Sequence, residues 1–378
     1  MTDSSTLELA EDEVQNFIMV WATVFVSLTY CYIISKITQK GFTRLLAILP
    51  IIALFLSLPL KLTSFHLGGT TAFFIAWLAN FKILLFAFGQ GPLCSLPTIS
   101  FPLFLALACF PIRIQQDPSP KTSQKSQNGT NPVHNSQNKN DPDQKTAQKP
   151  QKKSLWNYLI KAVLLALIIK IYDYNELIHP NVLWFIFCFH MYFFLELALS
   201  LFAAVVKYFS GCEIEPPFDE PLLSSSLQDF WGRRWNIMVT RILRPSVYLP
   251  TLNLSSKVIG REWASLPSVM ATFLVSALMH ELIFYYLGRI TPTFDVTWFF
   301  LLHGFCLCVE VAIKKAVGRK WRVPRWISGP ATVAFVVATG FWLFLPPLVR
   351  AGLDTRPFEE FAAGGKFVRS VKHALSFQ

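Results

Sequence analysis

The sequence predicts an all-α, polytopic integral membrane protein. Hydrophobic residues make up 53% of its 378 residues, and phenylalanine alone occurs 35 times. The mean hydropathy of +0.41 is not that of a soluble domain of this length. Apolar stretches of about 20 residues recur along the chain, which is the length that a helix needs to cross a bilayer. Because lipid offers no hydrogen bonds to the backbone, these stretches are expected to be helices.

Eight spanning helices are expected, at 16–37, 44–65, 67–89, 155–174, 181–207, 264–287, 297–317 and 328–348. The apolar segment 98–112 is shorter and contains Pro102, so it is expected to be re-entrant or interfacial rather than spanning. The segment 115–153 is rich in Gln, Asn, Lys, Ser and Pro and predicts a disordered cytoplasmic loop. This loop separates N-terminal membrane helices (1–114) from a second membrane region (154–378) that carries the candidate catalytic residues.

The net charge of +11 is explained by membrane topology. Lys and Arg lie mainly in the gaps between apolar stretches, and basic gaps alternate with nearly neutral ones, as the positive-inside rule expects. With eight spans, this pattern puts both termini on the non-cytoplasmic side. Nucleic-acid binding is not expected, since no basic-aromatic platform accompanies the charge. Membrane lipids are the expected surroundings.

Several classes of chemistry are excluded by pattern. The seven cysteines are an odd number without a CxxC pair, which supports neither a disulfide framework nor a metal site. The chain has no GxSxG motif for a serine nucleophile and no GxxxxGK[ST] loop for nucleotide hydrolysis. The candidate chemistry therefore rests on ionisable residues inside the apolar stretches.

His280 is the first of these residues. It lies within a spanning stretch, where an ionisable side chain is costly and is a functional candidate by default. A neutral imidazole can take a proton from a hydroxyl group and return it to a leaving group, as transfer of an acyl group to an alcohol requires. The alternative is a histidine that only hydrogen-bonds between packed helices.

A second segment, 229–236, reads Asp-Phe-Trp-Gly-Arg-Arg-Trp-Asn. On an α-helix Asp229 and Arg233 would be i,i+4 and could form a salt bridge, and Trp231 and Trp235 would share a face. The alternative is an aromatic anchor at the membrane interface, where Trp and Arg are both favoured. The sequence alone weighs the two interpretations equally.

Asn236 would lie one helical turn from Gly232, which leaves room for a substrate beside its amide. That amide could donate a hydrogen bond to a thioester carbonyl or to the oxyanion that develops from it. Arg234 and Arg241 would lie two turns apart, with Arg244 close to their face. Such a stripe could bind the phosphates of coenzyme A or attract anionic lipid headgroups, and the lipid interpretation is favoured.

Three further polar residues lie in spanning stretches without an assigned reaction. His303 and Glu310 are seven residues apart and share a helical face, so they could be a second polar pair near the site. Hydrogen bonding across the bundle is the favoured interpretation of both. Lys82 is expected to extend its side chain toward the cytosolic face.

Four sequence motifs in the same order resemble those of a known family. They are Trp77-Leu-Ala-Asn80-Phe-Lys82-Ile-Leu-Leu-Phe-Ala-Phe, Ser226-Leu-Gln-Asp229-Phe-Trp-Gly-Arg-Arg-Trp-Asn236, Ala277-Leu-Met-His280-Glu281 and His303-Gly-Phe-Cys-Leu-Cys-Val-Glu310. With these motifs the chain resembles, nearly end to end, the plant wax synthases (long-chain-alcohol O-fatty-acyltransferases) of the membrane-bound O-acyltransferase superfamily.

The resemblance implies a helical bundle with an internal substrate tunnel, which acyl-CoA enters from the cytosol and a hydrophobic acceptor enters from the bilayer. The catalytic histidine of the superfamily maps onto His280, and its second motif residue, an asparagine or aspartate, maps onto Asn236. A tyrosine-containing variant of the second motif occurs in related enzymes, so the role of Asn236 follows less directly. Asp229, Trp231, Arg233, Arg234, Trp235, Arg241, His303 and Glu310 are the candidate substrate-binding residues.

The expected function is esterification of a long-chain alcohol with the acyl group of acyl-CoA in the endoplasmic reticulum membrane, without a metal or a covalent cofactor. Acylation of a sterol is the alternative within the same family. A lipid transporter or an inactive membrane scaffold is the alternative from another class.

Overall fold

The computed structural model describes residues 2–94, 100–111, 154–210, 216–318 and 323–352, together with Arg356 and Glu360. The regular structure of these residues is helical throughout, and the predicted loop 115–153 lies outside them. The α-helices are α1 (Thr2–Ile37), α2 (Phe42–Ser57), α3 (Phe65–Thr71), α4 (Asn80–Ala87), α5 (Phe101–Cys109), α6 (Leu155–Ile171), α7 (Pro180–Ser210), α8 (Leu227–Asp229), α9 (Ile237–Leu243), α10 (Leu249–Ile259), α11 (Ser265–Gly288), α12 (Asp295–Val317), α13 (Arg325–Thr339) and α14 (Leu345–Arg350).

Eight helical stretches are long and apolar enough to cross a membrane, which confirms the eight predicted spans. They are Glu11–Ile37, Phe42–Lys61, Phe65–Ala87, Leu155–Tyr174, Pro180–Val205, Ser265–Gly288, Asp295–Val317 and Arg325–Arg350. Helix α5 has only 9 residues and is therefore about 14 Å long. This length agrees with the prediction that 98–112 does not span.

Two of the spans, and the stretch between α8 and α10, contain π-helical segments, in which the hydrogen bonds join residues i and i+5. Among the described residues these segments are η2 (Ala72–Ala79), η7 (Phe230–Arg234), η8 (Arg244–Tyr248) and η9 (Gly340–Phe344). Such turns are rare in proteins and often occur at functional sites. Segments η2, η7 and η9 all contribute to the candidate site described below.

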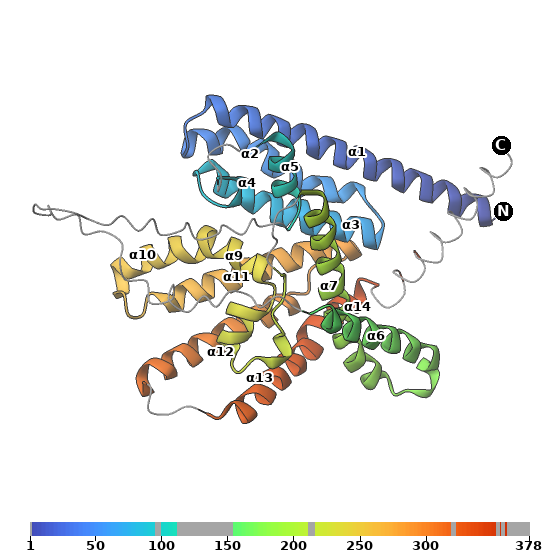
Figure 1. Cartoon of the computed structure of the whole chain (residues 1–378), viewed down its shortest axis with the longest axis vertical. Coiled ribbons are helices and arrows are strands. Elements are labelled where there is room, and N and C mark those ends of the chain that lie inside the picture. The colour runs from blue at the N-terminus through green and yellow to red at the C-terminus, as the bar shows by residue number, and fades with distance from the viewer. Residues whose placement is uncertain are drawn as a thin grey trace, which may run out of the picture.

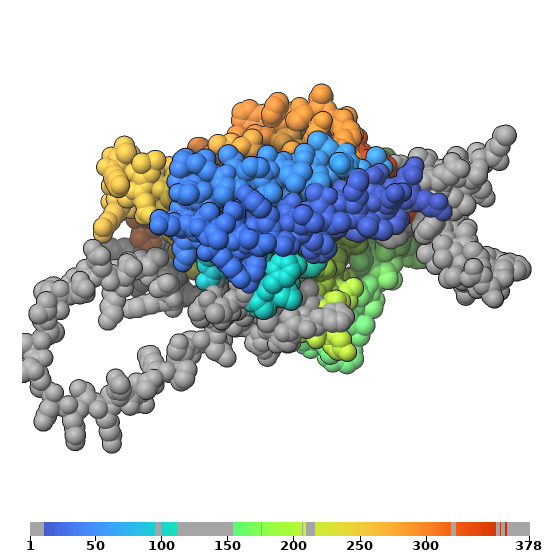
Figure 2. Space-filling view, turned by 90° about the horizontal axis from the view of Figure 1, so that it is seen from above, coloured from blue at the N-terminus to red at the C-terminus, as the bar shows by residue number. Residues whose placement is uncertain are grey.

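The helices form several groups around a central layer (Figure 1). Helices α1, α2, α4 and α5 lie on one side, α12 and α13 lie on the other, and α9, α10 and α11 lie between them, while α6 and α7 form a hairpin beside the bundle. Viewed from above, α1 and α2 cover one face of the molecule (Figure 2). Met238 and Ile242 of α9 belong to the same buried apolar cluster as the N-terminal helices, so α9 joins these helices to the rest of the bundle.

The predicted orientation of the Lys82 side chain is wrong. Its side chain is fully buried instead of extending toward the cytosolic face. The Nζ group donates hydrogen bonds to the carbonyl oxygens of Leu107, at 2.7 Å, and of Phe110. The last carbonyls of a helix have no partner within the helix and attract a cation. The lysine thereby holds the C-terminal end of the short helix α5 against the bundle.

A buried charge cluster holds the chain that leads into the 229–236 segment. Lys161 of α6 donates to Glu196 of α7 and to Glu220, each at 2.8 Å. Lys161 is 6% exposed and Glu196 is 0% exposed. A buried charge is tolerated only when it is paired, so this cluster fixes the chain at Glu220, which precedes the segment, to the α6–α7 hairpin.

Two carboxylates bind the chain at the start of α3. Glu13 of α1 accepts hydrogen bonds from the backbone N–H groups of Thr63 and Ser64, and Glu360 accepts bonds from the Ser64 hydroxyl and the Phe65 N–H. Residues 13 and 360 therefore lie at the same end of the bundle. A chain that returns to the same side of the membrane crosses it an even number of times, which agrees with the eight spans.

The contacts of Glu360 predict an acid-dependent contribution to stability. Burial alone would raise the pKa of Glu360, but hydrogen bonds from the His66 ring, the Phe65 and His66 N–H groups and the Ser64 hydroxyl lower that pKa from 4.5 to about 2. A lowered carboxyl pKa stabilises the fold above pH 4.5, and this contribution is lost as the pH falls toward 2. We expect Glu360→Gln to lower the melting temperature at pH 7 by about 2–4 °C and to flatten its decline in acid.

Thermal unfolding of the detergent-purified protein between pH 7 and pH 3 measures this effect. Glu11→Gln is the matched control, because Glu11 is exposed and should leave the melting curve unchanged. Identical acid profiles for Glu360→Gln and the unmodified protein would contradict the assignment.

Candidate active site

His280 presents one free ring nitrogen. Its Nδ1 atom lies 2.8 Å from the carbonyl oxygen of Ser276, one turn earlier on α11. A carbonyl oxygen can only accept a hydrogen bond, so Nδ1 carries the proton and Nε2 keeps its lone pair. No described residue hydrogen-bonds to Nε2. This is the tautomer that a general base needs.

Aromatic side chains surround the His280 ring. Ring centroids lie 5.2 Å away for Trp77 of η2, 4.4 Å for Phe300 of α12 and 5.8 Å for Phe344 of η9. These three residues come from three different spans, so the ring faces the interior of the bundle. The residue as a whole is nevertheless only partly buried.

The pairing within 229–236 differs from the prediction. Arg234, and not Arg233, forms the ion pair with Asp229, with 2.9 Å between Nε and Oδ2. The cause is the π-helical turn η7, because widening the turn places residue i+5 rather than i+4 beside residue i. Arg233 is exposed and has no ion-pair or hydrogen-bond partner among the residues that the structure describes.

The predicted arginine stripe is also wrong as a continuous helical face. Segment η7 ends at Arg234, and α9 begins at Ile237. The guanidinium of Arg234 also donates hydrogen bonds to the carbonyl oxygens of Asp219 and Glu220. Its side chain therefore stabilises the loop that precedes α8. Arg241 follows on α9 and is exposed, which separates it from Arg234.

Asn236 lies in the break between these two helices. Its backbone has φ 41° and ψ 65°, a left-handed conformation that asparagine tolerates better than most residues. Its side-chain oxygen accepts a hydrogen bond of 3.3 Å from the Val239 N–H and caps α9. The predicted helical face shared with Gly232 is therefore wrong, since the two residues are not on one helix.

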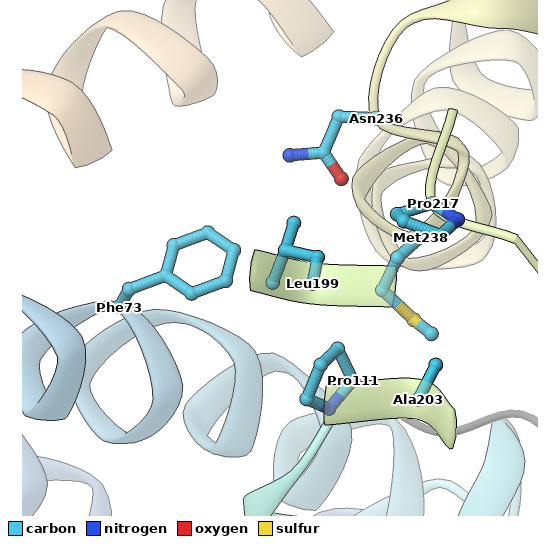
Figure 3. Close-up of a pocket in the computed structure, with 7 residues that line it drawn as sticks. All are labelled: Phe73, Pro111, Leu199, Ala203, Pro217, Asn236 and Met238. Carbon is cyan, nitrogen blue, oxygen red and sulfur yellow. The ribbon is translucent and has the colours of Figure 1, made fainter. Parts of the chain in front are cut away.

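The amide nitrogen of Asn236, unlike its oxygen, does not take part in capping α9. It points away from α9 at one end of a narrow recess, in which Leu199 is central and Pro111 and Ala203 lie at the other end (Figure 3). Phe73, Pro217 and Met238 complete the lining. The nitrogen has no hydrogen-bond partner within the described part of the chain, so the amide can still donate to a ligand.

His303 has no free ring nitrogen. The indole N–H of Trp231 donates to its Nδ1 at 3.0 Å, which leaves the proton on Nε2, 2.8 Å from the hydroxyl of Thr339. The side chain is fully buried. His303 thus joins η7, α12 and α13 in a hydrogen-bonded chain, as the favoured structural interpretation expects.

Glu310 also forms hydrogen bonds that join two parts of the chain. Its carboxylate accepts hydrogen bonds from the Leu227 N–H at 2.9 Å and from Lys314 at 2.5 Å, and so holds the start of α8 against α12. Trp231 and Trp235 do lie near each other, with ring centroids 6.3 Å apart. Trp235 stacks on Phe230 at 5.4 Å, which packs the segment that carries Asn236.

His280 and Asn236 are linked through two aromatic rings rather than by a direct hydrogen bond. Asn236 shares its recess with Phe73, Phe73 contacts Trp77 at 5.4 Å, and Trp77 contacts His280. Sequence reasoning assigned no role to Phe73 or Trp77. The available signal was the tryptophan that begins the first of the four motifs.

Comparison with known proteins places this site in a family. Residues 214–302, which include Asn236 and His280, match the membrane bound O-acyl transferase family. An acyl-CoA–sterol O-acyltransferase of Arabidopsis thaliana is 43% identical over 96% of this chain and 98% of its own length. A probable long-chain-alcohol O-fatty-acyltransferase of the same plant is 42% identical over 92% of this chain and 93% of its own length. The long-chain-alcohol O-fatty-acyltransferase of Simmondsia chinensis is 40% identical over 93% of this chain and 94% of its own length. With its eight spans and this extent of similarity, the chain belongs to the membrane-bound O-acyltransferase family.

Proposed function

We propose that the protein transfers the acyl group of acyl-CoA to the hydroxyl group of a long-chain alcohol and forms a wax ester. The relatives of Simmondsia chinensis and Arabidopsis thaliana that are named for this activity support the proposal. The observation that carries it is the unbonded Nε2 of His280, which lies inside the bundle with its lone pair available.

In the proposed reaction the thioester lies beside Trp77, between the His280 imidazole and the Asn236 amide. Nε2 of His280 takes the proton of the acceptor hydroxyl as its oxygen attacks the thioester carbon. The amide of Asn236 donates to the oxyanion of the tetrahedral intermediate. When the carbon–sulfur bond breaks, the imidazolium returns the proton to the leaving thiolate. The products are the ester and coenzyme A, and no metal or covalent cofactor takes part.

The exposed arginines Arg233 and Arg241 are proposed to attract anionic groups. The phosphates of coenzyme A and the headgroups of anionic lipids share this chemistry. We further propose that the protein works in the endoplasmic reticulum membrane, and that an internal tunnel brings the two substrates together. Asn236 and the recess beside it would form part of the donor's path.

A sterol is the second candidate acceptor, because the relative at 43% identity is named for sterol acylation. Microsomes that contain the protein should be supplied with labelled acyl-CoA and with a fatty alcohol, a sterol or diacylglycerol in parallel. We expect the highest kcat/KM with the fatty alcohol. A higher value with the sterol would replace the wax-ester proposal. No transfer to any acceptor by well-folded protein would end the acyltransferase proposal and favour a transporter or a scaffold.

A further inference from the structure

Trp77 carries a buried hydrogen-bond donor without an acceptor. Its side chain is 3% exposed, and the indole N–H forms no hydrogen bond with any described residue. Burying a donor without a partner destabilises a fold, and such groups are uncommon enough in native structures that each needs an explanation. A phenyl ring would avoid this cost, although it would fill less space, so the unpaired N–H is a candidate for a hydrogen bond to a ligand.

The position of Trp77 provides an explanation. Its ring meets the His280 ring nearly edge-on, with centroids 5.2 Å apart and planes at 72°. The same ring also meets Phe73, with centroids 5.4 Å apart, and Phe73 lines the recess beside the Asn236 amide. Trp77 therefore contacts one candidate catalytic group directly and is linked to the recess of the other through Phe73. It belongs to η2, a π-helical segment of the kind that often marks functional sites.

We propose that the indole N–H of Trp77 is a second donor to the oxyanion of the acyl-transfer reaction. The inference rests on the proposed function and adds to it a residue that touches the reacting atoms. Attack on the thioester places a negative charge on the carbonyl oxygen, and the amide of Asn236 and the indole of Trp77 share that charge. The charge disappears when the thiolate leaves and the ester carbonyl forms.

The chemistry of the indole group distinguishes this role from binding of the acceptor alcohol. An indole nitrogen can donate a hydrogen bond but cannot accept one, so it cannot replace His280 as the group that takes the hydroxyl proton. An oxyanion needs only donors. Donors aimed at such an oxygen in a water-excluded site stabilise the transition state more than the bound substrate, and the effect should therefore be on kcat rather than on KM.

The test is Trp77→Phe, which keeps an aromatic ring in place and removes the N–H together with part of the indole's volume. We expect kcat to fall by about 10²-fold, the loss typical of one oxyanion donor, with KM for both substrates unchanged. The smaller ring leaves a cavity, which destabilises the fold, but removing the unpaired donor offsets part of that cost. The melting temperature should therefore fall no further than in the matched control variant Trp21→Phe. Binding of labelled acyl-CoA to the variant should also be unchanged.

Trp21→Phe is the matched control. The indole N–H of Trp21 does have a partner, the hydroxyl of Thr71 at 3.3 Å, and Trp21 contacts neither candidate catalytic group. This variant loses the same ring volume and also a hydrogen bond, so it should keep kcat and be at least as destabilised as Trp77→Phe, in which kcat falls.

Three outcomes would overturn the inference. One is an unchanged kcat in Trp77→Phe while the unmodified protein is active. Another is a melting temperature that falls further than in Trp21→Phe, with activity reduced only in proportion to folded protein, which would assign the N–H to a contact with the face of the Phe73 ring. The third is a raised KM for the alcohol with unchanged kcat, which would assign the N–H to the acceptor. An unmodified protein that transfers no acyl group would instead refute the proposed function itself.

Discussion

His280→Ala should reduce acyl transfer by about 10²–10⁴-fold, the usual contribution of a general base. The reason is that Nε2 of His280 holds the free lone pair, which the hydrogen bond from Nδ1 to Ser276 leaves in place. His280→Phe should be similarly inactive, because it keeps a ring among Trp77, Phe300 and Phe344 but has no lone pair. Initial rates with labelled acyl-CoA and a fatty alcohol, normalised to folded protein, measure the loss.

His190→Ala is the control for His280→Ala. His190 also lies in a spanning helix, but its Nδ1 pairs with the hydroxyl of Tyr172 at 3.1 Å, and it contacts none of the site residues. Its removal should leave kcat close to that of the unmodified protein. If His280→Ala retained nearly full activity at normal expression, His280 would be a packing residue and the proposed reaction would need another base.

Asn236→Gly should reduce kcat by about 10²–10³-fold, the effect of removing an oxyanion donor, while the protein stays folded. Glycine adopts the left-handed backbone conformation freely, and as a helix N-cap it costs only a few tenths of a kcal/mol relative to asparagine. The variant therefore removes the amide nitrogen with little other change. Activity assays and melting curves on the same preparation separate the two effects.

Asn236→Ala provides the comparison. Alanine loses the cap, at about 0.5–2 kcal/mol, and strains the left-handed backbone by roughly 1–2 kcal/mol. It should match Asn236→Gly in kcat per folded protein and be clearly less stable. Full activity of the glycine variant would show that Asn236 serves the turn and the cap alone.

The fold could be predicted largely because membrane insertion depends on local properties of the chain. Each span needs its own run of apolar residues and satisfies its own backbone, so the eight segments were visible without knowledge of their neighbours. The same reasoning identified His280, because an imidazole within such a run is conspicuous whatever surrounds it. The motif around Asn236 could be recognised from its tryptophan and arginine residues, but the left-handed backbone conformation of Asn236 could not be predicted.

Partners that depend on the path of the backbone could not be predicted in this way. Counting along an ideal α-helix predicted an ion pair between Asp229 and Arg233. Because of the π-helical turn η7, Asp229 forms its ion pair with Arg234 instead. Similarly, Lys82 was expected to reach toward water because the sequence does not reveal that α5 ends beside it. The local helix geometry decided the hydrogen-bond partner of Asp229, and a distant segment of the chain decided that of Lys82.

By itself, therefore, the sequence determined the membrane architecture and indicated the two residues proposed to carry the reaction. The architecture and His280 follow from polarity along the chain, and Asn236 follows from its motif. Only the tertiary structure decided which nitrogen of His280 is free, which histidine is instead locked between Trp231 and Thr339, and where the unpaired indole of Trp77 lies. The first property depends on the side-chain conformation of His280, whose Nδ1 atom bonds to Ser276 of the same helix. The other two depend on atoms contributed by different spans at distances of a few ångström. Helix packing fixes such conformations and distances, and the order of residues along one helix does not reveal them.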